Sequence, residues 1–338
     1  MSGIEWPSVE HRASRWHPAW HVAATLAILL AGGCSEADPP PTSAPNRAGI
    51  EPATAIAPLR VVSLSPAISR TVQDLGLEHW LVGRTPYCTG LPERVAVVGD
   101  LTSIDPEALR QVRPDMILVQ PAHGGVQPAL EELAATSGWK VEPYPIDSLE
   151  DLEALIDSLP RVLFAAAGEV SQAQTVETVR RLNAMLASVR AVSAPLSPAE
   201  VAAVGRAAVL FSIEPPMAFG AGTFVDGLLG RLGVSNAITA NGYPELSLED
   251  LVRIDPDLVI LLREQESGSE EAVTALASLG LGRDRGGVQR VIDSQALTPG
   301  SGWIDAAVAL RMVIEKAAAR QGGRSNAATA PVSEQDPS

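Results

Sequence analysis

The chain has 338 residues, of which 46% are hydrophobic and 19% charged, and its formal net charge is −15. The hydrophobic fraction is ample for a buried core, whereas the acidic balance argues against a nucleic-acid partner, because such partners require basic patches. Three of the five histidines lie in the first 21 residues. The remaining two, His79 and His123, are too few for a metal site built on several histidines, so we expect neither a metal site nor a resident cofactor.

The first 33 residues have the features of a signal peptide. Two arginines precede an apolar stretch at residues 22–30, which is too short to cross a bilayer as a helix. Small residues then lead to Cys34 in a pattern that resembles a bacterial lipobox, with Ala31 at the position where leucine is usual. We therefore expect a lipidated Cys34 that anchors the protein to a bacterial membrane on its periplasmic or extracytoplasmic side. The alternative is a plain secretory signal with an incidental cysteine.

Two segments are not expected to fold. Residues 34–58 are rich in Pro, Ala, Ser and Thr and predict a flexible tether, because they hold too few bulky apolar side chains to bury a core. Residues 321–338 have a similar Gly, Ala, Ser and Pro composition and predict a disordered tail. The folded part therefore extends from about residue 59 to residue 320, a length that suits one large domain or two modest ones.

Alternating strands and helices are expected in the first part of the folded chain, residues 59–164, which we interpret as an N-terminal lobe. The predicted strands cover about residues 60–64, 80–83, 95–98, 116–119 and 140–144. The predicted helices cover about residues 68–75, 105–112 and 126–137. This alternation indicates βα units around a parallel sheet.

Residues 105–119 and residues 247–261 repeat one pattern. Each copy has a short amphipathic helix, a Pro-Asp turn at Asp115 or Asp257, and an unbroken apolar run. Such runs are typical of strands buried on both faces of a parallel sheet. Two copies this far apart indicate two similar lobes with a cleft between them, and we interpret Pro-Asp itself as turn chemistry. Open α/β sheets bind ligands at the carboxyl ends of their strands, which here are followed by residues 120–123 and 263–266.

Residues 165–195 predict one long helix between the lobes. From residue 165 to residue 192, apolar residues recur at helical spacing, with no proline and no glycine after Gly168. A helix of about 27 residues would be about 40 Å long, enough to link two lobes. The C-terminal lobe, residues 196–320, is expected to hold strands near 207–213, 258–262 and 288–292 and helices near 224–232, 247–254 and 304–319.

Together these elements predict an α/β fold of two Rossmann-like lobes with parallel sheets, joined by one long backbone α-helix. A single long helix is stiffer than two or three extended linkers. We therefore expect only small lobe rotations on ligand binding.

Several segments, in this order and spacing, resemble one family. They are Arg60-Val-Val-Ser-Leu-Ser-Pro-Ala67, Leu81-Val-Gly-Arg-Thr85, both Pro-Asp repeats and Phe219-Gly-Ala-Gly-Thr-Phe224. The chain resembles substrate-binding proteins of the ABC importers for vitamin B12, haem and iron–siderophores over nearly all of residues 59–320. The resemblance implies a monomeric, non-enzymatic receptor that binds a metal chelate between its lobes and delivers it to an ABC permease. Arg70 departs from the pattern, because relatives often have a glutamate after the Ser or Thr of the first helix.

The loop at residues 84–88 resembles that of cobalamin-binding relatives, so we expect cobalamin ahead of haem, with ferric siderophore third. Tyrosine and tryptophan suit a large ring, and Arg263 suits a carboxylate, amide oxygen or phosphate. Tyr87 and Tyr243 could instead be loop anchors, Cys88 a small semi-buried residue, and His123 either an axial ligand or a hydrogen-bond partner. The expected ligand-binding residues are Ser65, Pro66, Tyr87, Cys88, Gln120 and His123 in the first lobe and Phe219, Tyr243, Arg263 and Trp303 in the second.

The resemblance also implies a surface for the permease, because relatives place one exposed glutamate on each lobe to meet permease arginines. The matching region of the first lobe carries Gln127, with Glu131 further along. The second lobe offers Glu270 and Glu271. These four residues are the expected docking positions.

Two other functions stay open. One is an enzyme on a doubly wound scaffold, such as a chelatase; residues 220–222 are the nearest approach to a phosphate loop, but the third glycine is missing. We expect no catalytic residues. The other is a surface lipoprotein that binds another protein, which the acidic balance and the long tether would allow.

Overall fold

The computed structural model describes residues 58–100, 103–121, 125–282, 287–298 and 300–328. The expected signal peptide, Cys34 and nearly all of the tether lie outside the described residues, as does His123. None of the described helices combines the length and the apolar composition needed to cross a bilayer.

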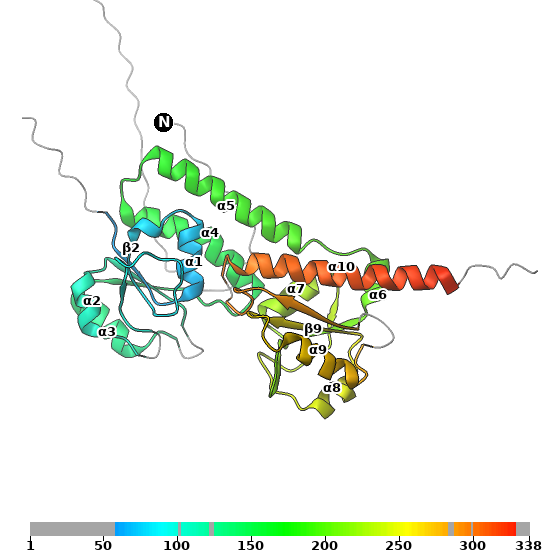
Figure 1. The fold of residues 1–338 in the computed structure, drawn as a ribbon. Coiled ribbons are helices and arrows are strands. Elements are labelled where there is room, and N and C mark those ends of the chain that lie inside the picture. The colour runs from blue at the N-terminus through cyan, green and yellow to red at the C-terminus, as the bar shows by residue number, and fades with distance from the viewer. Residues whose placement is uncertain (1–57, 101–102, 122–124, 283–286, 299, 329–338) are drawn as a thin grey trace, which may run out of the picture. The chain divides into compact units, whose positions relative to one another are not determined.

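The N-terminal lobe is built on a parallel sheet with the strand order β3-β2-β1-β4-β5 (Figure 1). The strands are β1 (Val61–Ser63), β2 (Leu81–Arg84), β3 (Ala96–Val97), β4 (Met116–Val119) and β5 (Lys140–Pro143). Its helices are α1 (Pro66–Asp74), α2 (Pro106–Val112) and α3 (Pro128–Ser137), with a 3-10 turn η1 (Glu78–Trp80) before β2. The five strands lie where the sequence predicts them.

Buried apolar side chains explain this sheet. Every residue of β1 and β4 is buried, as expected for strands covered on both faces. On one face, Val62, Ile117 and Val119 pack against Leu109 of α2 and Leu130 of α3. All three helices begin with a proline in the first turn, where its missing N–H costs nothing.

The C-terminal lobe has a sheet with the order β10-β9-β6-β7, and the short β8 also pairs with β6. The strands are β6 (Arg206–Ile213), β7 (Pro216–Ala218), β8 (Ser235–Asn236), β9 (Leu258–Arg263) and β10 (Gly287–Ile292). The helices are α6 (Pro198–Val204), α7 (Phe224–Leu232), α8 (Leu248–Ile254), α9 (Ser269–Ser278) and α10 (Trp303–Ala328). All pairings are parallel except β6–β7. The sequence missed β7, because a three-residue strand that begins with the second of two prolines carries too little periodicity to be recognised.

The two sequence repeats fold in the same way. The Asp115 carboxylate accepts a hydrogen bond from the backbone N–H of Arg60 at 2.8 Å, and the Asp257 carboxylate accepts one from Arg206 at 2.8 Å. Each aspartate therefore ties the turn after a repeat helix to the first strand of its lobe. The residue two positions earlier has a positive φ in both copies, 42° and 49°. These matched contacts confirm the Pro-Asp pairs as turn chemistry.

Two helices connect the lobes, α4 (Leu149–Ala167) and α5 (Gln172–Val192), and they pack side by side (Figure 1). The expected helix at 165–195 corresponds to α5, but it begins later, because α4 ends at Gly168 and Ser171 caps a new helix. Gly168 has a φ of 73°, a conformation that ends helices. The sequence pattern merged the last turn of α4 with α5.

Each of these two helices has one end against each lobe. Near its start, α4 packs on α7, where Glu153 pairs with Arg231 at 2.5 Å. Near its end, the Phe164 ring lies 5.8 Å from that of Trp80 in the N-terminal lobe. The start of α5 docks on the N-terminal lobe, since Gln174 donates a hydrogen bond to the Gly76 carbonyl at 3.1 Å.

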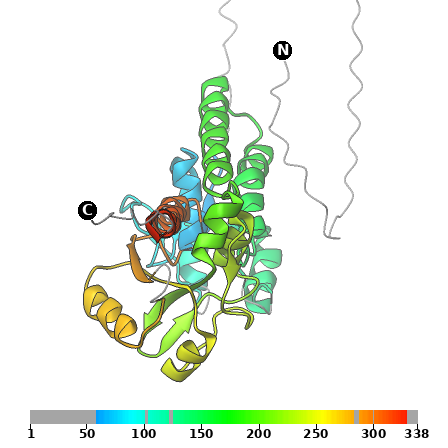
Figure 2. The same ribbon diagram turned by 90° about the vertical axis from the view of Figure 1, so that its right-hand side faces the viewer.

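The end of α5 is fixed by α10. The Arg311 guanidinium donates to the carbonyls of Ala191, Val192 and Ala194 at 3.4, 3.1 and 2.6 Å, which satisfies backbone groups that a helix end leaves open. Figure 2 looks nearly along the axis of α10. This helix runs on to Ala328, past residue 321, where the sequence predicted the start of a disordered tail.

Candidate functional site

In the N-terminal lobe, Ser65 and Gln120 meet at the carboxyl edge of the sheet. Ser65 follows β1 and Gln120 follows β4, which is the neighbour of β1. The Ser65 hydroxyl donates to Gln120 Oε1 at 2.8 Å, and Ser65 Oγ itself accepts a hydrogen bond from the backbone N–H of Ile68 at 3.4 Å. Pro66 is half-buried in the first turn of α1. Three of the expected site residues thus lie together where open α/β sheets bind ligands.

Tyr87 and Cys88 lie on the loop after β2, in different surroundings. The Tyr87 side chain is 66% exposed, whereas that of Cys88 is 4% exposed. The Cys88 sulfur accepts a hydrogen bond from Ser69 Oγ at 3.1 Å and lies 3.2 Å from Thr85 Oγ1. These contacts favour the interpretation of Cys88 as a small residue that holds the loop against α1. They leave the Tyr87 ring free to meet a ligand.

In the C-terminal lobe, Phe219 and Tyr243 belong to an aromatic cluster. The Phe219 ring contacts the rings of Phe211, Phe224 and Tyr243 at centroid distances of 5.0, 5.3 and 5.7 Å. Phe219 is 2% exposed and Tyr243 is 44% exposed. The buried Phe219 ring therefore packs against the exposed ring of Tyr243 from the interior of the lobe. Tyr243 presents an apolar face and one polar hydroxyl.

The Tyr243 hydroxyl is biased toward its neutral form. Burial raises its pKa, and the negative charge of Asp147, which lies just before α4, raises the pKa further. A neutral phenol donates one hydrogen bond. Tyr243 is therefore suited to a ligand group that accepts one.

Trp303 begins α10 and lies in the core. Its ring centroid is 4.9 Å from that of Phe224, and the residue is 1% exposed. Its indole N–H has no hydrogen-bond partner among the residues that the structure describes. In this structure Trp303 presents no face to a ligand, so its place in the site stays a prediction.

A cavity of about 540 Å³ opens at the carboxyl ends of β6 and β9. Arg263 at the end of β9 lines it together with Phe211, Ser212 and Glu214, which lie at and just beyond the end of β6, and with the first turns of α9. Within the described ranges, no carboxylate forms an ion pair with the Arg263 guanidinium. Arg263 therefore lies at the end of its strand and lines a cavity, and its guanidinium is available to bind a ligand.

The four expected docking residues lie at equivalent places in the two lobes. Gln127 directly precedes α3, and Glu131 lies in the first turn of that helix. Glu270 and Glu271 lie in the first turn of α9. α3 follows the repeated strand β4 and α9 follows the repeated strand β9. All four residues are exposed, and Glu271 also lines the cavity.

The sequence did not single out Phe211, Ser212 or Asp147. Phe211 and Ser212 share the cavity with Arg263 because β6 and β9 are parallel neighbours. The signal for them is a polar residue at the end of an apolar strand, followed by a Glu-Pro-Pro turn. Asp147 raises the pKa of Tyr243, but the two residues are far apart in the chain, so no local sequence pattern reveals the interaction.

Of the expected ligand-binding residues, Arg263 lines the cavity, whereas the exposed rings of Tyr87 and Tyr243 are not part of its lining. The aromatic rings, hydroxyl groups and guanidinium of these residues suit reversible binding of a large ligand that is partly apolar and carries anionic or amide groups. Among the described side chains, no three of His, Cys, Asp and Glu gather in a way that could hold a metal ion.

Comparisons with known proteins identify the family and the proteins that share this fold. A family model described as periplasmic binding protein matches residues 61–277. A search of curated proteins finds no match. Among solved structures, the periplasmic vitamin B12 binding protein BtuF of Vibrio cholerae is similar with a TM-score of 0.59 and 18% identity, covering 78% of this chain and 99% of that chain.

Two haem-binding proteins have comparable similarity. The periplasmic haem-binding protein of Pseudomonas aeruginosa has a TM-score of 0.55 and 23% identity, covering 77% of this chain and 94% of that one. RhuT from Roseiflexus sp. RS-1 has a TM-score of 0.55 and 20% identity, covering 78% and 100%. At these identities the likeness establishes the shared two-lobed fold. Together with the family match over residues 61–277, it shows that the chain belongs to the periplasmic binding protein family.

Proposed function

We propose that this protein is the tethered receptor of an ABC importer, which captures a metal-containing ring or chelate outside the cytoplasm as a monomer and delivers it to a permease. Membership of the periplasmic binding protein family supports a binding role. The observation that carries the proposal is the cavity of about 540 Å³ at the ends of β6 and β9, with Arg263 in its lining. That volume lies within the range of small-molecule sites.

Among such ligands we place cobalamin first, haem second and ferric siderophore third. The loop at residues 84–88 resembles that of cobalamin-binding relatives, and its Tyr87 is 66% exposed. Tyr243 offers a second phenol ring from the other lobe. Two flat rings suit the face of a macrocycle, and the Arg263 guanidinium suits a phosphate or carboxylate at its edge.

Titration calorimetry of the purified protein with cyanocobalamin, haemin and a ferric hydroxamate siderophore tests the proposal. We expect heat of binding with one of the three, cobalamin before the others. The variant Arg263→Gln should then bind about 10- to 100-fold more weakly, the range for a lost charge-assisted hydrogen bond. The matched control is Arg253→Gln on α8, where the arginine is exposed and pairs with Asp250 of the same helix. Silence with all three ligands would overturn the proposal.

Delivery to a permease predicts that Glu270 and Glu271 carry the contact from one lobe, and Gln127 and Glu131 from the other. Charge reversal of Glu270 to arginine should abolish uptake in cells and leave ligand affinity of the purified protein largely intact, because Glu270, unlike Glu271, does not line the cavity. Glu249→Arg is the control, because Glu249 is also exposed in a first helical turn but lies on α8. Unchanged uptake would count against docking through α9.

The membrane anchor is a separate part of the proposal. Lipidation of Cys34 would place the receptor at the membrane surface, with the residues up to about 58 as its tether. The variant Cys34→Ser should move the protein from the membrane fraction to the soluble extracytoplasmic fraction. Retention of the variant in the membrane fraction would rule out a lipid on this cysteine as the anchor.

A further inference from the structure

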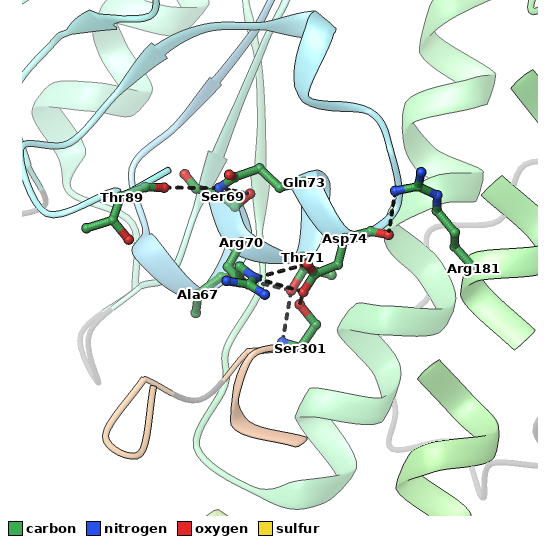
Figure 3. A network of polar contacts seen from close by, with 9 residues as sticks. All are labelled: Ala67, Ser69, Arg70, Thr71, Gln73, Asp74, Thr89, Arg181 and Ser301. Carbon is green, nitrogen blue, oxygen red and sulfur yellow. Dashed lines mark hydrogen bonds and ion pairs between the residues drawn. The ribbon is translucent and has the colours of Figure 1, made fainter. Parts of the chain in front are cut away.

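The C-terminal lobe contacts helix α1 of the N-terminal lobe through the segment that leads into α10. Ser301 makes two hydrogen bonds with α1 (Figure 3): its hydroxyl donates to Asp74 Oδ2 at 2.7 Å, and its backbone N–H donates to Thr71 Oγ1 at 3.2 Å. Ser301 is 5% exposed and Thr71 is fully buried. Shielding from water strengthens such bonds.

Gly300 fits against the same helix so closely that a side chain has no room. A Cβ at Gly300 would lie 2.7 Å from the Ala67 carbonyl oxygen and 2.9 Å from the Ala67 Cα. The Thr71 hydroxyl donates to that same carbonyl at 2.9 Å. Backbone therefore meets backbone here, and the contact requires a glycine.

Asp74 is oriented for this contact by its own lobe. Arg70 Nε lies 3.0 Å from both carboxylate oxygens (Figure 3). From α5, the Arg181 guanidinium donates to the Asp74 carbonyl at 3.4 Å and Gln174 donates to the Gly76 carbonyl at 3.1 Å. Helix α1 is thus fixed at its end by α5 and along its side by Ser301.

The two elements that form the contact also carry or contact expected ligand-binding residues. At the other end of α1, Ser65 caps the helix and bonds to Gln120. On the opposite side of the contact, Trp303 packs on Phe224, which contacts Phe219. The position of one lobe's site residues relative to the other's therefore depends on this contact as well as on the connecting helices.

We propose that Thr71, Asp74, Gly300 and Ser301 form an interlobe latch, which holds the lobes of the ligand-free protein at one angle and limits their rotation. The latch is a further connection, separate in the chain from α4 and α5. Small lobe rotation then follows from the latch together with the helices, because the latch adds a direct contact between α1 and the C-terminal lobe.

The test uses the ligand-free full chain and two readouts: hydrogen exchange of the α1 amides and small-angle X-ray scattering. In Ser301→Ala and Gly300→Ala, we expect the α1 amides to exchange about tenfold faster and the distribution of interatomic distances to broaden. Ser301→Thr keeps the hydroxyl and should restore most of the protection.

Each latch variant has a matched control that makes the same substitution, serine to alanine or glycine to alanine, at a position outside the latch. Ser278→Ala removes a hydroxyl that bonds only to Ala275 of its own helix. Gly230→Ala adds a Cβ that meets nothing within 4 Å. In both controls, the exchange of the α1 amides should be no faster than in the parent protein, and the distribution of interatomic distances should not broaden. If Gly300→Ala fails to fold, Ser301→Ala carries the test, because it introduces no steric clash.

Two results would overturn the latch. Unchanged exchange and unchanged scattering in Ser301→Ala would show that the bonds do not hold the lobes. Faster exchange with unchanged scattering would reduce the contact to a local support of α1. Neither readout involves a ligand, so failure of the latch and failure of the proposed function are distinguishable.

Discussion

The Asp115 carboxylate accepts a hydrogen bond from the backbone N–H of Arg60 at 2.8 Å, and this bond fixes the turn of the first repeat to the first strand of its lobe. Replacing Asp115 by alanine should lower the free energy of unfolding by about 1 kcal/mol, because the solvent-accessible N–H of Arg60 loses a charged acceptor. Urea-induced unfolding followed by circular dichroism measures the change. Asp115→Asn keeps an acceptor oxygen and should cost less.

The second repeat predicts a matching loss in the other lobe. Asp257→Ala removes the equivalent bond to Arg206, so its effect should resemble that of Asp115→Ala in size. A marked loss in one lobe with none in the other would contradict the equivalence of the two turns.

Two glycines of α7 form a matched pair for testing the packing of α7 on α4. Gly230→Ala should raise the free energy of unfolding by up to about 1 kcal/mol, because alanine favours a helix and the new Cβ meets nothing within 4 Å. Gly227→Ala should gain less or lose stability, since its Cβ would lie 3.0 Å from the Leu149 Cβ. Thermal unfolding of both variants checks this order, and a larger gain at Gly227 would disprove the close packing.

The Arg231 guanidinium pairs with Glu153, whose side chain is 11% exposed. The carboxylate of Glu153 raises the pKa of Arg231, an effect opposed by burial. Arg231→Ala would leave Glu153 without this partner and should lower the free energy of unfolding by about 1–3 kcal/mol, a range reduced because Arg231 is partly exposed. Denaturant unfolding measures it. The exposed arginine of the Arg180–Glu177 pair is the control, and its removal should have little effect.

Glu177 predicts a dependence on acid. Hydrogen bonds from Arg180 and Arg181 lower the pKa of its carboxyl from 4.5 to about 2. Because the folded-state pKa is depressed, the carboxylate contributes to stability above pH 4.5, and this contribution is lost as the pH falls from 4.5 to about 2. Carbon-13 NMR titration of the side chain gives the pKa directly. In the double variant Arg180→Ala, Arg181→Ala it should rise toward 4.5, and an unchanged value would exclude the arginines as its cause.

Tyr243 and Asp147 predict an effect between residues far apart in the chain. Burial and the Asp147 charge raise the pKa of the Tyr243 hydroxyl. Asp147→Asn removes the charge and leaves the burial, so the pKa should fall but stay above its ordinary value. NMR of ring-labelled tyrosine, assigned with Tyr243→Phe, follows the titration. No change in Asp147→Asn would mean that the two groups are not close in solution.

Much of the fold could be predicted because its signals are local. The apolar runs of β4 and β9 have no polar alternation, and every residue of β4 is buried. The predicted end of α7 at Gly233 is confirmed, with that glycine at a φ of 83°. The boundary between α4 and α5 was missed, because a four-residue break between two helices hardly disturbs a helical periodicity. The capping box at Ser148 and Asp151 is the signal that marks the start of α4.

The candidate site could be predicted only in outline. Strand ends are visible in a sequence, and both Gln120 and Arg263 lie at them. Burial depends on tertiary packing, which the sequence does not display. Trp303 follows a glycine-rich turn and was expected to bind the ligand, yet it is 1% exposed and its ring packs against that of Phe224. Phe211 was missed for the converse reason: it lies within a strand pattern, and the pairing of β6 with β9 brings it to the cavity.

The side-by-side packing of α4 and α5 has a mechanical consequence. One rod between two bodies resists bending but lets them twist about its axis. Two helices that pack side by side, each in contact with both lobes, resist twisting as well, since a twist of the lobes would have to slide one helix along the other. The faces that the two lobes turn toward a ligand are therefore set before the ligand arrives. Binding then costs little orientational entropy, and selectivity rests on shape and charge that are already in place.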